Sequence, residues 1–148
     1  MSGKHTGFTH GFAATEHDTR GALAEIMMRL RIIGVPDEQA GGVEIAVTEA
    51  VNNIVEHAYR DVDRGSIMIR AGVTGNVLRV LLVDEGAELP GAELPAGRPA
   101  NIDTALDDLP EGGFGWFMIR TLTRDIRYRR WRGRNHLRLQ FDLIPTVG

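Results

Sequence analysis

The stretch of sequence that decides the fold is Glu44-Ile45-Ala46-Val47-Thr48-Glu49-Ala50-Val51-Asn52-Asn53-Ile54-Val55-Glu56-His57-Ala58-Tyr59. Its apolar residues recur at steps of three or four, which predicts an amphipathic helix with one face against a core. Beside that stripe, Glu49, Asn53 and His57 follow at four-residue steps and share a second, narrow face. Such a column can bind a metal, position a water or move a proton. Taken alone it is more often a solvated helix flank, so its interpretation depends on the rest of the chain.

Length and composition limit the class of protein. The 148 residues suffice for one domain, which we expect to span 1–148. A hydrophobic content of 43% and a charged content of 25% are typical of soluble globular proteins. The sequence has no cysteine, no signal-peptide core and no apolar run long enough for a bilayer, so we expect a cytoplasmic protein without disulfides or a membrane partner. A net charge of −3 argues weakly against nucleic acid as the main partner.

Charge is nevertheless distributed unevenly along the chain. The segment 88–111 is acidic, whereas arginines crowd the C-terminal quarter. These arginines are Arg120, Arg124, Arg127, Arg129, Arg130, Arg132, Arg134 and Arg138. The ordinary interpretation is a set of solvated strand and helix faces. The alternative is a surface that attracts an acidic partner and speeds association with it.

Hydrophobic periodicity predicts the order of the elements along the chain. The expected elements are a weak edge strand at 5–12, helices at 15–33 and 37–59, strands at 66–73 and 77–83, a helix that 112–115 opens and that carries 116–122, and strands at 126–131 and 137–143. Strands joined by tight turns pair antiparallel, and the helices should lie together on one face. The predicted fold class is therefore α+β, a two-layer sandwich with a mixed, mostly antiparallel sheet.

Two further pieces of sequence carry chemistry. Asp84-Glu85-Gly86 ends the most apolar strand, where a carboxylate can accept a hydrogen bond from an amino group such as that of adenine, and a glycine lets a flat ligand approach. Gly112-Gly113-Phe114-Gly115 opens a helix, where backbone N–H groups can bind an anion. Between them, the proline-rich segment 87–111 is either a functional loop or a tolerated insertion. Each signal is weak alone, but their order is specific.

The runs at 49–58, 83–86 and 112–120 together resemble the N, G1 and G2 boxes of the GHKL ATPase superfamily, which includes gyrase and the histidine kinases. The likeness is greatest to its small bacterial members, the anti-sigma factor serine/threonine kinases of the RsbW and SpoIIAB type. It covers about residues 15–143 and implies the Bergerat-type ATP-binding fold.

The resemblance implies roles for the polar column. Asn53 would ligate Mg²⁺ bridging the phosphates of ATP, and Glu49 would be the general base toward an incoming hydroxyl. His57 would line the same cleft. This set is chemically sensible, since phosphoryl transfer mostly needs positioning and charge neutralisation.

The resemblance also implies how the nucleotide is held. Asp84 would bind the adenine amino group and Gly86 would flank the base. Gly113 and Gly115 would offer backbone N–H groups to the phosphates, with a lid over them at about 87–112.

The function implied is an ATP-dependent serine/threonine kinase that phosphorylates a STAS-domain anti-anti-sigma protein and, as a homodimer, sequesters a sigma factor. Glu88 stands where many relatives have a second glycine. Pro110-Glu111 stand where some relatives have a basic residue that neutralises the terminal phosphate, so either Arg98 supplies that charge or phosphoryl transfer is slow. Three alternatives therefore stay open: a nucleotide-binding regulatory module without phosphoryl transfer, a detached histidine-kinase domain, and a small α/β domain without a nucleotide site.

Overall fold

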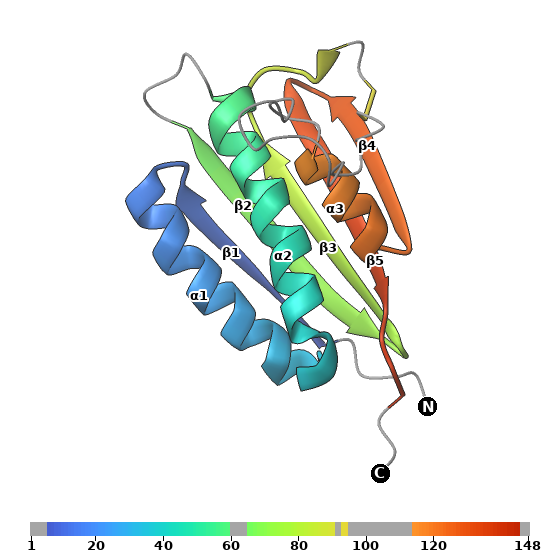
Figure 1. Cartoon of the computed structure of the whole chain (residues 1–148). Coiled ribbons are helices and arrows are strands. Elements are labelled where there is room, and N and C mark those ends of the chain that lie inside the picture. The colour runs from blue at the N-terminus through green and yellow to red at the C-terminus, as the bar shows by residue number, and fades with distance from the viewer. Residues whose placement is uncertain (1–5, 60–64, 91–92, 95–113, 146–148) are drawn as a thin grey trace, which may run out of the picture.

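The fold is one five-stranded sheet with helices packed against one side, as a computed structural model describes it for residues 6–59, 65–90, 93–94 and 114–145 (Figure 1). The elements are β1 (Thr6–Ala13), α1 (Glu16–Ile33), α2 (Asp37–Asn53), η1 (Ile54–Ala58), β2 (Ser66–Thr74), β3 (Val77–Asp84), α3 (Phe114–Leu122), β4 (Asp125–Trp131) and β5 (Arg134–Asp142). The strand order is β1-β2-β3-β5-β4. This arrangement confirms the predicted two-layer α+β fold.

Strand pairing is antiparallel between all neighbours in the described part of the chain, so the sheet has no parallel component there. The hairpins β2–β3 and β4–β5 close through two-residue turns, Gly75-Asn76 and Arg132-Gly133. Positive φ angles of 62° at Gly75, 51° at Arg132 and 74° at Gly133 suit such turns, because they match the right-handed twist of the strands. The weak strand expected at 5–12 is β1, which pairs with β2 along its whole length.

Helix ends follow the local sequence signals in α1 and depart from them in α2. The Thr15 hydroxyl accepts a hydrogen bond from the Asp18 N–H at 3.0 Å, and Gly34 ends α1 with a φ of 126°. The second helix was expected to run to about residue 59, but its α-helical part ends at Asn53. Ile54–Ala58 then form one wider π-helical turn, η1, closed by a 3.1 Å bond from the Tyr59 N–H to the Ile54 carbonyl.

The core lies between the helices and one face of the sheet, which we call the covered face. Its fully buried side chains come from every layer: Ile26 and Leu30 from α1, Val47 and Val51 from α2, Ile119 from α3, and Ile69, Val80, Leu82 and Leu139 from the strands. Alternate residues of β2 and β5 are buried and exposed, as their sequence alternation predicts. The apolar contact between the layers therefore fixes which strand face meets the helices.

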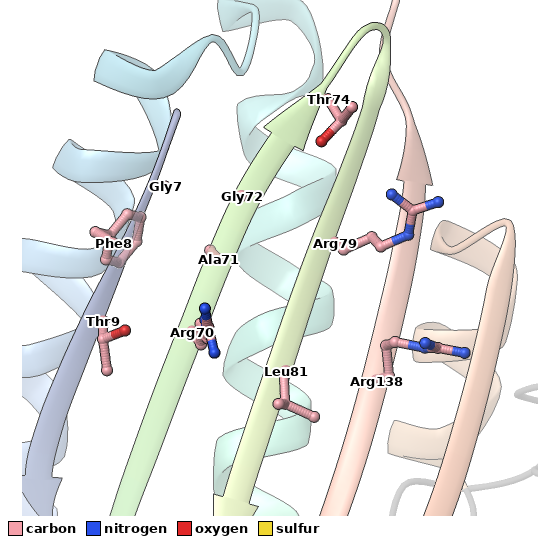
Figure 2. Close-up of a pocket in the computed structure, with 10 residues that line it drawn as sticks. All are labelled: Gly7, Phe8, Thr9, Arg70, Ala71, Gly72, Thr74, Arg79, Leu81 and Arg138. Atoms are coloured by element: carbon pink, nitrogen blue, oxygen red, sulfur yellow. The ribbon is translucent and has the colours of Figure 1, made fainter. Parts of the chain in front are cut away.

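The opposite side of the sheet, which we call the open face, is not covered by any described helix (Figures 1 and 2). Its side chains include Met68, Arg70, Arg79, Leu81, Arg127, Arg129, Trp131, His136 and Arg138. Among the described residues, no helix has both the length and the apolar character needed to cross a membrane.

Candidate functional site

The predicted polar column begins on α2 and ends in the π-helical turn. Glu49 and Asn53 lie in the last turn of α2, and His57 lies in η1. Because a π turn holds more residues than an α turn, the step from Asn53 to His57 differs from the α-helical step assumed from the sequence. The two side chains nevertheless line the same cavity. Single π turns of this kind occur frequently at functional sites.

Asp84 ends β3 on the covered face and is only 4% exposed. Its Oδ1 accepts hydrogen bonds from the Gly86 N–H at 2.9 Å and from Asn135 Nδ2 at 2.8 Å. Within the described part of the chain both bonds go to Oδ1, so Oδ2 is the oxygen available to a ligand. Burial raises the pKa of the Asp84 carboxyl, while the two hydrogen bonds and the Arg130 charge offset part of that effect.

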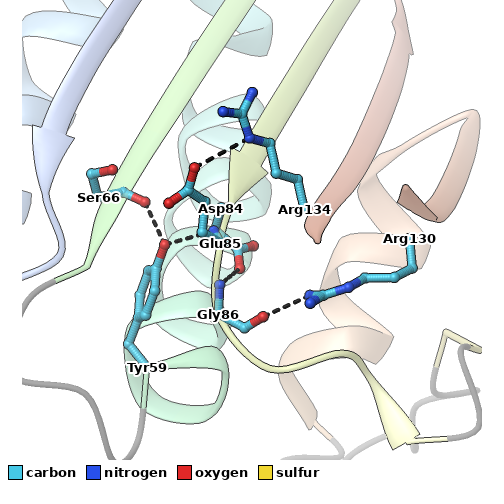
Figure 3. Close-up of polar contacts among 7 residues, drawn as sticks. All are labelled: Tyr59, Ser66, Asp84, Glu85, Gly86, Arg130 and Arg134. Atoms are coloured by element: carbon cyan, nitrogen blue, oxygen red, sulfur yellow. Dashed lines mark hydrogen bonds and ion pairs between the residues drawn. The ribbon is translucent and has the colours of Figure 1, made fainter. Parts of the chain in front are cut away.

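The turn after Asp84 is held from the helix side by Tyr59 (Figure 3). The Tyr59 hydroxyl donates to the Ser66 carbonyl at 2.7 Å and accepts from the Glu85 N–H at 2.7 Å. Burial raises the pKa of Tyr59, so the phenol stays neutral and can serve both bonds. The end of the helix, the start of β2 and the end of β3 are thereby tied to one side chain.

Gly86 packs directly on η1. The Ala87 N–H donates to the Ala58 carbonyl at 2.8 Å, and a Cβ on Gly86 would lie 2.7 Å from the Ala58 Cβ. A side chain at this position would therefore push the turn away from the helix. The sequence suggested that Gly86 flanks a bound base; the structure shows a packing reason for a glycine here, and the contact with a base stays a prediction.

Asn135 of β5 holds the same turn from the sheet side. Its Nδ2 donates to Asp84 and to the Ala87 carbonyl, the latter at 2.9 Å. Its Oδ1 accepts from the Tyr128 hydroxyl and from Arg130 Nη1, the latter at 3.0 Å. The orientation of the buried carboxylate thus depends on a fully bonded side-chain amide.

The segment after the turn is bonded to β4. Arg130 Nη1 donates to the Gly86 carbonyl at 2.6 Å (Figure 3), and the Tyr128 hydroxyl accepts from the Leu89 N–H at 3.1 Å. These bonds fix the chain as it leaves the buried strand and enters the predicted lid.

A cavity of about 300 Å³ joins these elements, which is at the lower end of the range for small-molecule sites. It is lined by Ala50, Asn53, Ile54, His57, Ala58, Asp84, Ala87, Glu88, Leu89, Pro90, Trp116, Tyr128, Asn135 and Leu137. Three of the predicted site residues, Asn53, His57 and Asp84, therefore open onto one space. Glu88 also lines this cavity, at a position where the resemblance would place a glycine.

Glu49 lies beside the start of α3. A Cβ built on Gly115 would be 2.8 Å from Glu49 Oε2 and 3.9 Å from Asn53 Nδ2, so the two column residues and this glycine meet at one point. Gly113 and most of the predicted lid lie outside the described residues, as do Arg98 and Pro110-Glu111. The absence of a side chain at Gly115 is therefore what lets the Glu49 carboxylate pack against the backbone of α3.

Asn53 offers a fit for a metal ion. Its Nδ2 is buried and has no hydrogen-bond partner in the described part of the chain. A buried amide with an unused group suits a ligand, since turning the amide presents oxygen instead of nitrogen at the same place. No cluster of three or more His, Cys, Asp or Glu side chains able to hold a metal occurs among the described residues. A magnesium ion at Asn53 would therefore need oxygen ligands from a bound phosphate as well.

Sequence reasoning gave no role to Asn135 or Tyr59. A signal for Asn135 was present: it occupies the inward phase of its strand with Leu137 and Leu139, and a buried Asn there needs hydrogen-bond partners. Tyr59 carries no such signal, because its partners come from two other elements.

Comparison with known proteins decides the family. A model of the histidine kinase-like ATPase domain matches residues 12–141. The chain belongs to this family. As a histidine kinase-like ATPase domain, it carries its cavity at the end of β3, between the second helix and the strands β4 and β5.

Its relatives confirm the resemblance to the small anti-sigma factor kinases. Serine-protein kinase RsbW of Bacillus cereus (strain AH820) is 33% identical over 108 residues, which cover 68% of this chain and 67% of that protein. Serine-protein kinase RsbW of Bacillus subtilis (strain 168) is 31% identical over 115 residues, 72% of this chain and 71% of that protein.

A solved structure shares the fold of this histidine kinase-like ATPase domain. The crystal structure of the RsbU and RsbW domains of Rv1364c from Mycobacterium tuberculosis superposes with a TM-score of 0.63 at 22% identity. The match covers 93% of this chain and 32% of that one, so the present chain spans about a third of the larger protein.

Proposed function

We propose that this chain is an ATP-dependent serine/threonine protein kinase and anti-sigma factor, which phosphorylates a STAS-domain anti-anti-sigma protein and sequesters a sigma factor. The observation that carries the proposal is the shared cavity of Asn53, His57 and Asp84, with Glu49 and Gly115 in contact beside it. Relatives at 31–33% identity are named serine-protein kinase RsbW, which supports a serine or threonine hydroxyl as acceptor.

Asp84 would select adenine. Its Oδ2 can accept a hydrogen bond from the exocyclic amine of adenine, whereas guanine presents a carbonyl oxygen at that ring position. Two acceptors facing each other in a buried site repel and leave both unpaired. The bonds from Gly86 and Asn135 to Oδ1 keep the carboxylate in one orientation, so little ordering is needed when the base binds.

Glu49 would act as general base. Its carboxylate takes the proton from the acceptor hydroxyl while that oxygen bonds to the γ-phosphorus of ATP, and ADP leaves with the electrons of the broken P–O bond. Asn53 would hold Mg²⁺, which neutralises phosphate charge when bound. Gly115, which has no side chain, lets the Glu49 carboxylate and the Asn53 amide lie close to the start of α3.

The remaining parts of the proposal concern organisation. We propose one nucleotide-binding domain over 1–148 with an ATP lid at about 87–112, acting as a homodimer in a bacterial cytoplasm. The absence of cysteine in the sequence agrees with a reducing compartment. Sedimentation of the purified chain, with and without a sigma factor, tests the dimer and the sequestration.

Glu49→Gln tests the kinase activity with a cognate STAS protein and Mg·ATP. The variant should bind nucleotide like wild type, yet transfer phosphate at least about 100-fold more slowly, since general-base catalysis contributes factors of that size. Glu44→Gln, on the same helix but outside the site, is the matched control and should keep full activity. A wild-type chain that binds ATP and leaves the STAS protein unmodified would refute the kinase proposal.

One observation favours a second candidate, a nucleotide-binding regulatory module that transfers no phosphate. Glu88 is one of the residues that line the cavity, and its negative charge opposes the binding of a polyphosphate. If this charge limits the site, Glu88→Gly raises ATP affinity and produces phosphoryl transfer that wild type lacks. Equal transfer by both proteins excludes this candidate.

A further inference from the structure

The open face of the sheet carries a groove that the kinase reaction does not use. It has a volume of about 560 Å³ and crosses β1, β2, β3 and β5, on the side away from the helices (Figure 2). Arg70, Arg79 and Arg138 line it together with Leu81, which pairs with Arg70 of β2 and with Arg138 of β5. Figure 2 shows these side chains on the near side of the strands, with the helices behind.

A second groove, of about 570 Å³, continues the first toward the other edge of the sheet. Leu81 and Arg138 line both grooves, so the two form one trough from β1 to β4. The second part adds Arg127, Arg129 and Trp131. We call this continuous surface the arginine trough.

Most of the positive charge in the trough has no acidic partner. The acidic side chains of the open face are already paired: Asp125 with Arg127 at 2.9 Å, and Asp142 with Arg124 at 2.6 Å. Across the described residues, no carboxylate lies within ion-pairing distance of the remaining arginines of the trough. These are Arg70, Arg79, Arg129 and Arg138. A protein of net charge −3 therefore presents a local positive surface.

The trough also exposes apolar side chains between its charges. Trp131 is 46% exposed and Leu81 is partly exposed; Met68, 37% exposed, lies on the same face but outside the residues that line the two grooves. The Arg129 and Arg132 guanidinium groups lie 5.6 and 4.5 Å from the centre of the Trp131 ring. Arg, Met and Trp are the residue types enriched in protein–protein interfaces. The surface is therefore suited to a protein more than to a bare inorganic anion.

We propose that the arginine trough docks an acidic segment of a partner protein, with carboxylates over the arginines and an apolar side chain against Leu81. An acidic segment complements this face better than a second copy of this chain does, because the carboxylates Asp125 and Asp142 of the face are already paired with arginines. The arginines of this surface lie on the opposite side of the sheet from the nucleotide cavity, and Tyr128 lines both the cavity and the second groove. The proposal stands whether or not the chain transfers phosphate.

Binding of a fluorescein-labelled, glutamate-rich peptide containing leucines tests the charge requirement. Arg79→Gln/Arg138→Gln should weaken binding at least about tenfold at low salt, because two charge-assisted contacts are lost. The control Arg20→Gln/Arg31→Gln changes the net charge equally but acts on α1, away from the trough, and should bind like wild type. A peptide with every Glu replaced by Gln should not bind.

Several outcomes would overturn the proposal. One is equal loss of binding in the trough and control variants, which would mean that net charge alone attracts the peptide. Tighter binding of duplex DNA or of anionic lipid vesicles than of the peptide would assign the trough to a different class of partner. Self-association of wild type that is lost in Arg79→Gln/Arg138→Gln would assign it to a second copy.

Unchanged ATP affinity in the trough variant shows that its fold is intact.

Discussion

The covered and open faces of the same sheet carry opposite chemistry on neighbouring residues. Leu82 is fully buried beneath the helices, whereas Leu81, its neighbour in β3, lies among arginines on the other side. Polar residues do occur on the covered face, but Asp84 and Asn135 sit together at one end of it. The comparison teaches that burial of apolar side chains stabilises most of the covered face, while its buried polar strand residues gather at one end and the charged strand residues lie on the opposite face.

The largest expected effect separates the two leucines. Leu82→Ala removes a fully buried side chain and should lower the free energy of unfolding by about 3 kcal/mol. Leu81→Ala should lower it by less than about 1 kcal/mol, because its side chain is partly exposed to solvent. Urea unfolding of both variants measures the difference. Equal losses would contradict the division into covered and open faces.

A second pair of substitutions compares glycines on the two faces. Gly86→Ala places a Cβ against Ala58 and should cost about 2 kcal/mol of stability through overpacking. Gly11→Ala, in β1, meets no atom within 4 Å and should change stability by less than about 1 kcal/mol. Thermal unfolding followed by circular dichroism checks both. A harmless Gly86→Ala would mean that the turn moves away from η1 without cost.

Asp84→Asn should weaken ATP binding without lowering the stability of the fold at pH 7. ATP affinity should fall at least about tenfold, or 1.4 kcal/mol, as the charged acceptor for adenine is lost. Because burial raises the folded-state pKa of Asp84, the ionised carboxylate costs stability, and this cost grows as pH rises through that pKa. The variant should therefore be at least as stable as wild type at pH 7, and its advantage should vanish below about pH 4, near the unfolded pKa of Asp.

Calorimetric titration of ATP and unfolding measured across pH test both halves of this expectation. Asp125→Asn provides a control, since its carboxylate is exposed and its pKa is lowered by Arg127 instead of raised by burial. Parallel loss of affinity and of stability at pH 7 would show that Asp84 is a structural residue first.

The smallest effect is expected for an ion pair on the open face. Arg124 and Asp142 are 2.6 Å apart but 62% and 51% exposed, so solvent screens their attraction. Arg124→Ala should change the free energy of unfolding by no more than about 0.5 kcal/mol. Chemical unfolding at low and high salt measures this. A loss above 1 kcal/mol would mean that charges on the open face contribute to stability.

The sequence predicted the elements well wherever one face is buried. Alternation in β5 correctly assigned Leu139 to the core and Arg138 to the other side, because a strand has a period of two. The four-residue step predicted that Glu49 and Asn53 share one face of the second helix, and both side chains lie near Gly115 in the structure. These patterns are local, so a single sequence contains them.

The parts that could not be predicted depend on contacts between distant elements. The π-helical turn carrying His57 is closed beside Tyr59, whose hydroxyl partners are Ser66 and the Glu85 N–H. The role of Asn135 depends on a partner in another strand. Strand alternation indicates that Asn135 is buried, but the sequence does not name its partner or the partners of Tyr59, so only the assembled sheet reveals them.

The bond between Asn135 and Asp84 joins residues 51 positions apart, and it connects two hairpins that can each form locally. The pairing of β3 with β5 is what brings the acid and its donor together. If Asp84 binds adenine as proposed, a partly unfolded chain whose hairpins have separated lacks that pocket. Nucleotide bound there would then stabilise the pairing of β3 with β5 against local opening.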